Sequence, residues 1–214
     1  MTITRFCLVR HGETDWNAAR RLQGHTDIDL NTRGLAQANQ MAHALKKINL
    51  QFDVLYTSDL QRAAKTAKAI EALFKTSAIS NSALRERHLG ALQGLTTDEA
   101  PIREPALWKS HLSRNIEERL RNGESIQQFA DRIKTALEQI REQHSGKTIL
   151  LVSHGGVLDM MYRIASNQPL HAEKKVAVPN ASVNWISHDG YAWTVNDWGD
   201  TSHLEGLALD NLDL

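Results

Sequence analysis

The chain has 214 residues, of which 41% are hydrophobic and 23% are charged, proportions that are ordinary for a globular protein with a substantial core. Lys plus Arg and Asp plus Glu number 25 each, so no overall field favours nucleic acid or a membrane surface, and neither partner is expected. No apolar run approaches the ~20 residues of a transmembrane helix, and no signal peptide is visible. The single cysteine, Cys7, excludes an internal disulfide and is expected to be buried, so we predict a cytoplasmic location.

Strand and helix patterns alternate along the chain. Apolar runs predict strands over residues 3–9, 53–58 and 147–153, and the turn signal "HDG" separates two further strands within 180–198. Helices are predicted over 14–21 (a short helix or turn), 31–48, 59–74, 125–143 and 154–166. The helix over 31–48 should bury Leu35, Ala38, Ala42 and Leu45 and be capped by Asn31 or Thr32, while Ser58 or Asp59 should cap the next one.

This alternation predicts an α/β fold with three α/β/α layers around a mainly parallel sheet. Residues 95–124 carry no strand signal, and we expect a helical insertion or lid there. No repeat, low-complexity segment or linker divides the chain, so we predict one domain over 1–214.

Polar side chains of related types follow three of the predicted strands. Arg10 and His11 follow the first strand, Arg62 lies one turn into the helix after the second, and Ser153 and His154 follow the third. Ligands of open α/β sheets bind outside the carboxyl ends of the strands. We therefore expect these side chains to converge at that edge, together with an acid from the "RERH" segment.

Backbone features at the same edge favour an anionic ligand. Gly12, Gly155 and Gly156 lie beside the two histidines, where a ligand needs close approach to the backbone, and we take Gly155 as a substrate-binding position. The helices that begin near Asp59 and Gly155 would direct backbone N–H groups toward the edge.

These residue types suit phosphoryl transfer through a phosphohistidine. A neutral imidazole at His11 is a good nucleophile near pH 7 when its second nitrogen donates to a backbone carbonyl. Arg10 and Arg62 can grip the equatorial phosphoryl oxygens in bidentate fashion. The leaving oxygen needs a proton, for which Glu86 is the candidate acid.

Four segments, "LVRHGETDWN", "YTSDLQRAAKTA", "LRERHLGALQGL" and "LLVSHGGVL", together resemble the histidine phosphatase superfamily, in particular its phosphoglycerate-mutase-like branch. The likeness runs in order from about residue 4 to residue 166. It implies that His11 becomes phosphorylated, that Glu86 donates the proton and that neither a metal nor another cofactor is needed. It also implies a phosphate pocket of Arg10, Asn17, Arg62 and His154, with Gln23 and Gly24 touching the substrate.

The same resemblance bears on whether the enzyme is a phosphatase or a mutase. Arg21, which we take as a further substrate-binding position, and "RERHLGALQGL" are similar to the mutase version. Mutases, however, typically carry Asn and then Arg where this chain has Gly156 and Asp159, and the carboxylate of Asp159 would repel a second anion. Trp108 is followed by Lys109 and Ser110, where mutases carry an Arg-Arg pair. The insertion also looks short for a mutase. The segment "GDTSHL" (199–204) resembles the tail of phosphatases.

We therefore predict a metal-independent phosphomonoesterase that acts on a small phosphorylated metabolite. A cofactor-dependent phosphoglycerate mutase is the first alternative, and a phospho-ligand sensor without turnover is the second. The sequence leaves the physiological substrate and the oligomeric state open, with a homodimer as one option.

Less specific interpretations exist for each of these residues. Arg62 would ordinarily be a solvated helix charge, and Glu86 could belong to a surface ion network with Arg85 and Arg87. A metal site built on His11, His154 and Glu86 is disfavoured by the neighbouring guanidinium groups. We expect Trp185 and Trp193 in the core, His88 or His203 near the pocket, and His25, His43, His111, His144, His171 and His188 on the surface.

Overall fold

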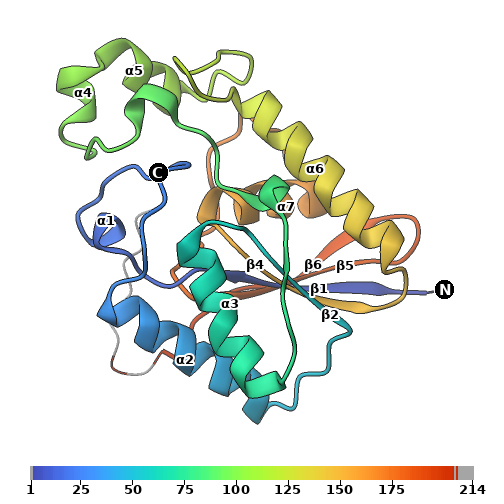
Figure 1. Cartoon of the computed structure of the whole chain (residues 1–214). Helices are drawn as coiled ribbons and strands as arrows, with labels where there is room; N and C mark the ends of the chain where they lie inside the picture. Colours follow the sequence, from blue (N-terminus) through green and yellow to red (C-terminus); the bar gives the residue numbers. More distant parts are fainter. Residues whose placement is uncertain (1, 205, 207–214) are drawn as a thin grey trace.

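The computed structural model describes residues 2–204 and 206 of the chain, and the remainder of the predicted 1–214 domain lies outside the described residues. Strands and helices alternate as predicted (Figure 1). In chain order the elements are β1 (Thr4–Arg10), α1 (Asp15–Ala18), α2 (Thr32–Lys47), β2 (Val54–Thr57), α3 (Gln61–Phe74), β3 (Ile79–Ser80), α4 (Ala100–Arg103), α5 (Pro105–Ser113), α6 (Ile126–Gln143), β4 (Thr148–Ser153), α7 (Gly155–Ser166), β5 (Val183–His188) and β6 (Trp193–Asp200).

A six-stranded sheet with the order β3-β2-β4-β1-β5-β6 forms the centre of the fold. Its first four strands are mutually parallel, and β5 and β6 are added antiparallel at one side. The prediction of a mainly parallel sheet is confirmed. In the register of β1 against β4, Arg10 lies opposite Ser153, so the residues that follow these two strands emerge side by side.

The alternation of side chains along β1 explains the three layers. Phe6 and Leu8 belong to the core cluster that packs against α6 and α7, whereas Cys7 and Val9 belong to the cluster that packs against α2 and α3. Both faces of the sheet are therefore covered by helices (Figure 1). Burial raises the pKa of the Cys7 thiol well above its usual range, as expected for a structural cysteine.

The helix caps differ in part from the predicted ones. The Asn31 side chain accepts from the Gly34 N–H at 2.8 Å and caps α2 as predicted. The helix α3 begins later than expected, after Leu60, and the predicted Ser58 or Asp59 cap is wrong. The carboxylate of Asp27, from a loop distant in sequence, takes the place of the predicted cap: it accepts a hydrogen bond from the backbone N–H of Gln61 at 2.7 Å.

One predicted core position is also wrong. Leu35 is 46% exposed, because the buried stripe of α2 runs through Ala38, Met41, Ala42 and Leu45. Trp185 and Trp193 are partly buried against the core, in agreement with the prediction.

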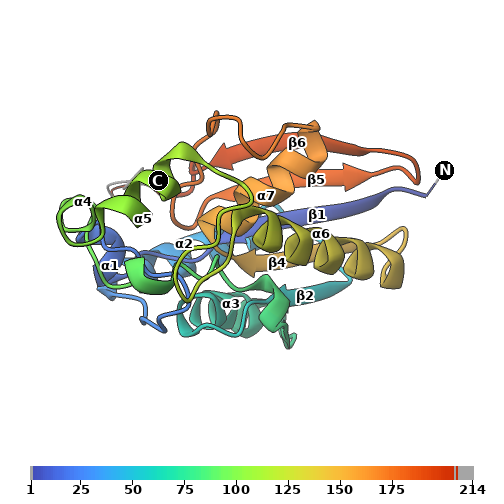
Figure 2. The same ribbon diagram turned by 90° about the horizontal axis from the view of Figure 1, so that it is seen from above.

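The segment 95–124 contains α4 and α5 and no strand, as predicted. It lies over the end of the molecule where β1, β2 and β4 finish, together with α1 (Figures 1 and 2). Leu92, Ala100 and Leu120 form a small separate core there, against which Leu22 and Trp108 pack. Within the described residues, no helix has the length and apolar character needed to cross a membrane.

Candidate active site

A cavity of about 300 Å³ lies at the carboxyl ends of the parallel strands. Eight of the ten predicted site residues line it: Arg10, His11, Asn17, Arg21, Gln23, Gly24, Arg62 and Glu86. His154 and Gly155 are not part of the lining, although Gly156 is. The lining also contains residues that were not predicted, from α5, α6, α7 and the segments between helices. We call six of them the far end of the cavity: Arg87, His111, Leu112, Arg114, Asp159 and Met160.

His11 is held in one tautomer by the backbone. Its Nδ1 lies 2.7 Å from the carbonyl oxygen of Gly12, which can only accept, so Nδ1 carries the proton and Nε2 keeps its lone pair. The side chain is 3% exposed. Burial lowers the pKa of His11 well below its usual range, and the charges of Arg62 and Arg10 lower it further. The ring is therefore neutral across the neutral pH range, with Nε2 free to act as a nucleophile.

His154 lies directly beside His11, with the ring centroids 5.2 Å apart. Its Nε2 is 2.8 Å from the hydroxyl oxygen of Ser58, at the end of β2. Its Nδ1 is buried and makes no hydrogen bond within the described chain. Burial, followed by the charge of Arg62, lowers the pKa of His154 well below its usual range. If Ser58 donates its proton to Nε2, Nδ1–H is left as a donor for a bound oxyanion.

The two arginines approach the same point from different elements. Arg62 is 1% exposed and uses its terminal nitrogens on the carbonyl oxygens of Thr26 at 3.0 Å and Gly24 at 2.8 Å. Burial lowers its pKa to about 10, so it stays charged at neutral pH. Arg10 is anchored through a 2.5 Å bond to the carbonyl of Val178, in the segment before β5. Both guanidinium groups are thus fixed by backbone oxygens before any ligand binds.

The loop that carries His11 is fastened to two helices. The Gly12 N–H donates to the Thr66 hydroxyl in α3 at 3.0 Å, and the Glu13 N–H donates to Gln37 in α2 at 2.8 Å. A side chain at position 12 would not fit, because a Cβ there would lie 2.4 Å from the carbonyl oxygen of Gly34. Packing therefore requires the glycine of the "RHGE" sequence, whatever the chemistry of the site.

Glu86 reaches the cavity from the segment between β3 and α6. One carboxyl oxygen accepts from the Arg87 N–H at 2.8 Å and the other from the Gly156 N–H at 2.9 Å. A Cβ at position 156 would lie 2.2 Å from the first of these oxygens, so only glycine permits this approach. The absence of a side chain at Gly156 is what lets Glu86 sit at the start of α7.

The two helix N-termini that were expected to face an anion are partly occupied by protein carboxylates. Asp27 takes the N–H of Gln61 at the start of α3, and Glu86 takes the N–H of Gly156 at the start of α7. We therefore correct the expectation. The positive ends of these helices serve to place two acidic side chains, and the arginines are left as the principal cationic groups for a phosphoryl group.

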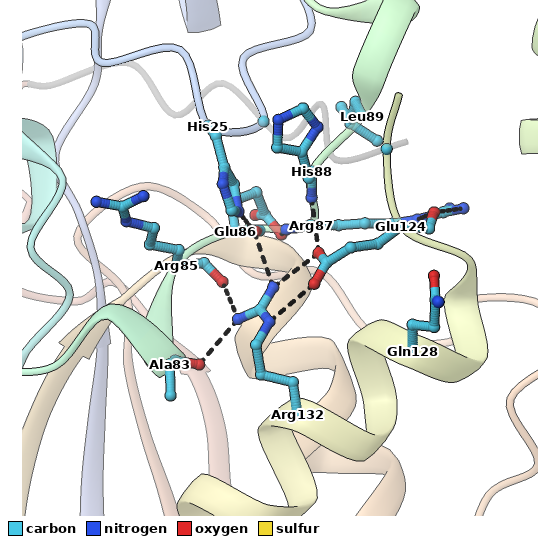
Figure 3. A network of polar contacts seen from close by, with 12 residues as sticks. His25, Ala83, Arg85, Glu86, Arg87, His88, Leu89, Glu124, Gln128 and Arg132 are labelled. Atoms are coloured by element: carbon cyan, nitrogen blue, oxygen red, sulfur yellow. Dashed lines mark hydrogen bonds and ion pairs between the residues drawn. The ribbon is translucent and has the colours of Figure 1, made fainter. Parts of the chain in front are cut away.

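A network around Arg132 supports the Glu86 segment from below (Figure 3). Its guanidinium donates to the carbonyl oxygens of Ala83, Arg85 and Glu86 at 2.8, 2.9 and 3.2 Å. It also makes two bonds, of 2.9 and 2.8 Å, to the carboxylate of Glu124. Sequence reasoning missed Arg132, because nothing in the pattern of α6 distinguishes it from a solvated helix charge.

Glu86 does not belong to the surface ion network that was weighed for it. Arg85 is engaged by Asp59 in a two-bond pair of 2.7 and 2.6 Å, and Arg87 points to the main-chain oxygen of Glu124. Among the described residues, no cluster of three His, Cys, Asp or Glu side chains could hold a metal ion. The alternative of a metal site therefore has no geometric support in that part of the chain.

The remaining predicted substrate contacts lie on the loop around α1. Asn17 is held by the Thr14 capping box, in which its carbonyl oxygen accepts from the Thr14 N–H at 3.1 Å. Arg21 forms a 3.0 Å ion pair with Glu99. Gln23 is 9% exposed, and its Oε1 is buried without a hydrogen bond to any described residue. This loop therefore offers amide groups and one arginine to a ligand.

Asp159 does not act as predicted. Its Oδ2 accepts from the buried guanidinium of Arg163 at 2.9 Å and lies 3.8 Å from Arg114. The carboxylate is therefore already neutralised by ion pairs. The argument that Asp159 would repel a second anion does not hold.

Several histidines were also misplaced. His111 lines the cavity, His188 is 8% exposed, and His25 is half-buried with Nε2 2.7 Å from the carbonyl of Glu86, so the expected surface positions of these three are wrong. His43 and His171 are exposed as predicted, whereas His144 is partly buried beside Tyr56. Neither His88, whose ring is tilted by 59° against that of His25, nor His203 is part of the cavity lining.

Comparison with known proteins agrees with this geometry. Residues 6–201 match the family model of the histidine phosphatase superfamily (branch 1). The chain is 42% identical over 209 residues to a metal-independent phosphoserine phosphatase of Arabidopsis thaliana, covering 97% of this chain and 86% of that protein. It is also 42% identical over 201 residues to phosphoglycerate mutase-like protein 4 of the same plant, covering 92% and 86%.

The solved structures that resemble the fold include the phosphoserine phosphatase of Entamoeba histolytica in complex with 3-phosphoglyceric acid. It has a TM-score of 0.83 and 27% sequence identity and covers 94% of this chain and 99% of that one. The chain belongs to the histidine phosphatase superfamily. The predicted family, fold class and enzyme class, a phosphatase, are confirmed.

Proposed function

We propose that His11 is the nucleophile of a phosphomonoesterase that works through a phosphohistidine. The observation that carries this is the 2.7 Å contact of Nδ1 with the Gly12 carbonyl, which leaves the Nε2 lone pair for the cavity. A buried ring beside two guanidinium groups stays neutral, so Nε2 is unprotonated and ready to attack. The substrate is a small phosphorylated metabolite, of the size of the ligands named for the relatives above.

In the first step, Nε2 of His11 forms a bond to phosphorus while the bond from phosphorus to the ester oxygen breaks. Arg10, Arg62, Asn17 and His154 hold the three equatorial oxygens, where the negative charge is spread. Glu86 gives its proton to the departing alkoxide. In the second step the oxygen of a water molecule forms a bond to phosphorus while the bond from phosphorus to Nε2 of His11 breaks. The proton of this water passes to Glu86, and inorganic phosphate leaves the free His11.

A rapid-quench experiment with a ³²P-labelled ester tests this assignment. We expect a phosphoenzyme that is labile to acid and stable to base, as a phosphohistidine is, and that disappears in His11→Gln. Folding of the variant is checked by circular dichroism. A labelled intermediate in His11→Gln, or full turnover by that variant, would refute the proposed role of His11.

The mutase remains a second candidate, because one of the relatives is named phosphoglycerate mutase-like. The two activities differ in what accepts the phosphoryl group, water or a second hydroxyl group. A coupled assay for interconversion of 2- and 3-phosphoglycerate, primed with 2,3-bisphosphoglycerate, separates them. We expect release of inorganic phosphate without interconversion. The cytoplasmic location and a homodimer stay predictions from the sequence.

A further inference from the structure

The peptide unit between His11 and Gly12 is held at both ends by other parts of the chain. Its N–H, which belongs to Gly12, donates to the hydroxyl of Thr66 at 3.0 Å. Its carbonyl oxygen, which belongs to His11, accepts from the side-chain amide of Asn180 at 3.0 Å and from the N–H of Ala181 at 3.2 Å. Because a peptide unit is planar and rigid, these contacts fix the backbone from which the His11 ring projects.

Ala181 contacts the backbone of both residues at the end of β1. Its N–H is shared between the carbonyl oxygens of Arg10, at 3.1 Å, and His11, at 3.2 Å. Its φ is +56°, in the left-handed region that favours glycine, and the residue is fully buried. A residue with a side chain keeps such a conformation only where the surrounding structure holds it. The other contacts of Ala181 therefore bear on the position of Arg10 and His11.

One of these contacts comes from His203, in the segment that follows β6. Its Nε2 lies 3.0 Å from the carbonyl oxygen of Ala181. A carbonyl oxygen can only accept, so Nε2 carries the ring proton. Burial lowers the pKa of His203 below its usual value, although the bond to Ala181 and the charge of Asp200 act in the opposite direction. The ring is therefore neutral at pH 7 and donates one hydrogen bond to Ala181.

The sequence "GDTSHL" builds the turn that places this ring. Gly199 begins it with a φ of +74°, and the Ser202 N–H donates to the carboxylate of Asp200 at 2.9 Å. Leu204 is 5% exposed and belongs to the same core cluster as Ala181. Covering the core needs only this leucine. The histidine before it makes a directed contact with the backbone, for which core packing gives no reason.

We propose that His203 is a positioning residue for the reaction, which acts through Ala181 to hold the backbone of Arg10 and His11. This inference rests on the proposed function, which makes His11 the nucleophile. In-line attack needs the nucleophile at about 3–3.5 Å from phosphorus, and a misplacement of about 1 Å can cost about 10²-fold in rate. His203 does not line the cavity, so its effect on the rate passes through the backbone.

Substitutions that keep or remove the donor at position 203 test the proposal. His203→Gln retains an amide N–H for the Ala181 carbonyl, whereas His203→Leu has no donor. We expect kcat/KM, measured by phosphate release, to fall about tenfold in His203→Leu and to stay within about threefold of wild type in His203→Gln. The fall should be the same for p-nitrophenyl phosphate and for an alkyl phosphate, because a displaced nucleophile slows the attack on both.

His43→Leu is the matched control, because His43 is an exposed histidine of α2 that does not line the cavity. Its kcat/KM should equal that of the wild type. Circular dichroism and urea denaturation establish that each variant is folded under the conditions of the assay. Should His203→Leu not fold, His203→Ser removes the same ring donor without adding an apolar side chain, and the same tenfold loss is expected of it.

The outcomes separate this inference from the proposed function. If the wild-type enzyme forms a phosphohistidine and a folded His203→Leu keeps the wild-type kcat/KM, the phosphatase stands and the positioning role is refuted. Equal losses in His203→Leu and His203→Gln would also overturn it, because the hydrogen-bond donor would then not be the cause. So would a loss confined to alkyl phosphates, which would place the effect at Glu86. If the wild type forms no phosphoenzyme, the proposed function fails and this inference fails with it.

Discussion

The two ends of the cavity are built in different ways. At the His11 end, Arg10, His11, Arg62 and His154 each end or follow a sheet strand or lie in the first turn of the next helix, and each is at most 3% exposed. Backbone carbonyls fix the imidazole and both guanidinium groups. The far end is assembled from Arg87, the insertion and α7, and its Leu112 is 53% exposed. The residues proposed for the reaction thus lie at the ends of sheet strands, whereas the far end is built on added segments of the kind that vary most between related proteins.

The largest effect is expected at the rigid end, from Arg62→Lys. Lysine keeps the charge but cannot hold the carbonyls of Gly24 and Thr26 and grip a phosphoryl oxygen at once. Loss of one fixed donor to transition-state charge costs about 10²–10³-fold in kcat. We expect a loss of that size in kcat/KM with every phosphate ester, measured by phosphate release.

Lys68→Arg is the control for that experiment. Lys68 lies on the same helix with a side chain that is 73% exposed, and it forms an ion pair with Glu71. Its variant should match the wild-type rate. Activity of Arg62→Lys within about threefold of wild type would show that the His11 end of the cavity does not depend on a planar guanidinium.

Gly156→Ala should separate activity from stability. The new Cβ would meet the Glu86 carboxyl at 2.2 Å and force it out of its place at the start of α7. Because general acid catalysis contributes about 10²–10⁴-fold, we expect kcat for an alkyl phosphate to fall by about 10²-fold. Alanine is a better helix former than glycine, so the thermal midpoint should not fall with it.

The leaving group provides the internal control for Gly156→Ala. p-Nitrophenolate departs without help from an acid, so p-nitrophenyl phosphate should lose much less activity than an alkyl phosphate. Equal losses with both substrates would mean that the displaced carboxyl has a role other than protonating the leaving oxygen.

The residues of the His11 end could be predicted from the sequence, because each lies in a short motif directly after an apolar strand. "RHGE", "TSDLQR" and "SHGG" each follow an apolar strand, and parallel strands bring their carboxyl ends to one edge. The residues of the far end could not be predicted in this way. Arg87 and Arg114 meet only because α5 folds over the sheet edge, and Asp159 is neutralised by Arg163 one helical turn further on. The true cap of α3, Asp27, is likewise distant in sequence.

Arg132→Lys tests whether the support beneath Glu86 matters for the reaction. One ammonium group cannot replace a guanidinium that bonds three carbonyls and the Glu124 carboxylate (Figure 3). We expect kcat for alkyl phosphates to fall about tenfold with little change in KM, because the acid is displaced but the phosphoryl pocket is intact. Arg141→Lys, on the same helix and paired with Glu138, should behave as wild type. A rise in KM alone would contradict a positioning role.

The smallest effect concerns pH and stability at the far end. Burial holds the pKa of His111 at about 4 in the folded state, against an ordinary value of 6.5. Between these values the unfolded chain binds a proton that the folded chain does not, so the free energy of unfolding falls as pH decreases from about 6.5 toward 4. Each such histidine adds about 1.4 kcal/mol per pH unit to the slope of the unfolding free energy against pH.

Replacing the ring removes that contribution. We expect His111→Gln to take up about one proton fewer on unfolding between about pH 6 and 4.5, so its unfolding free energy should decline less steeply over that range. Urea denaturation at a series of pH values measures this. His11 and His154 contribute to the same decline in both proteins, because the pKa of each is lowered by burial. The exposed His43, changed to Gln, should leave the slope unaltered. An unchanged slope in His111→Gln would mean that water reaches this ring and keeps its pKa close to the ordinary value.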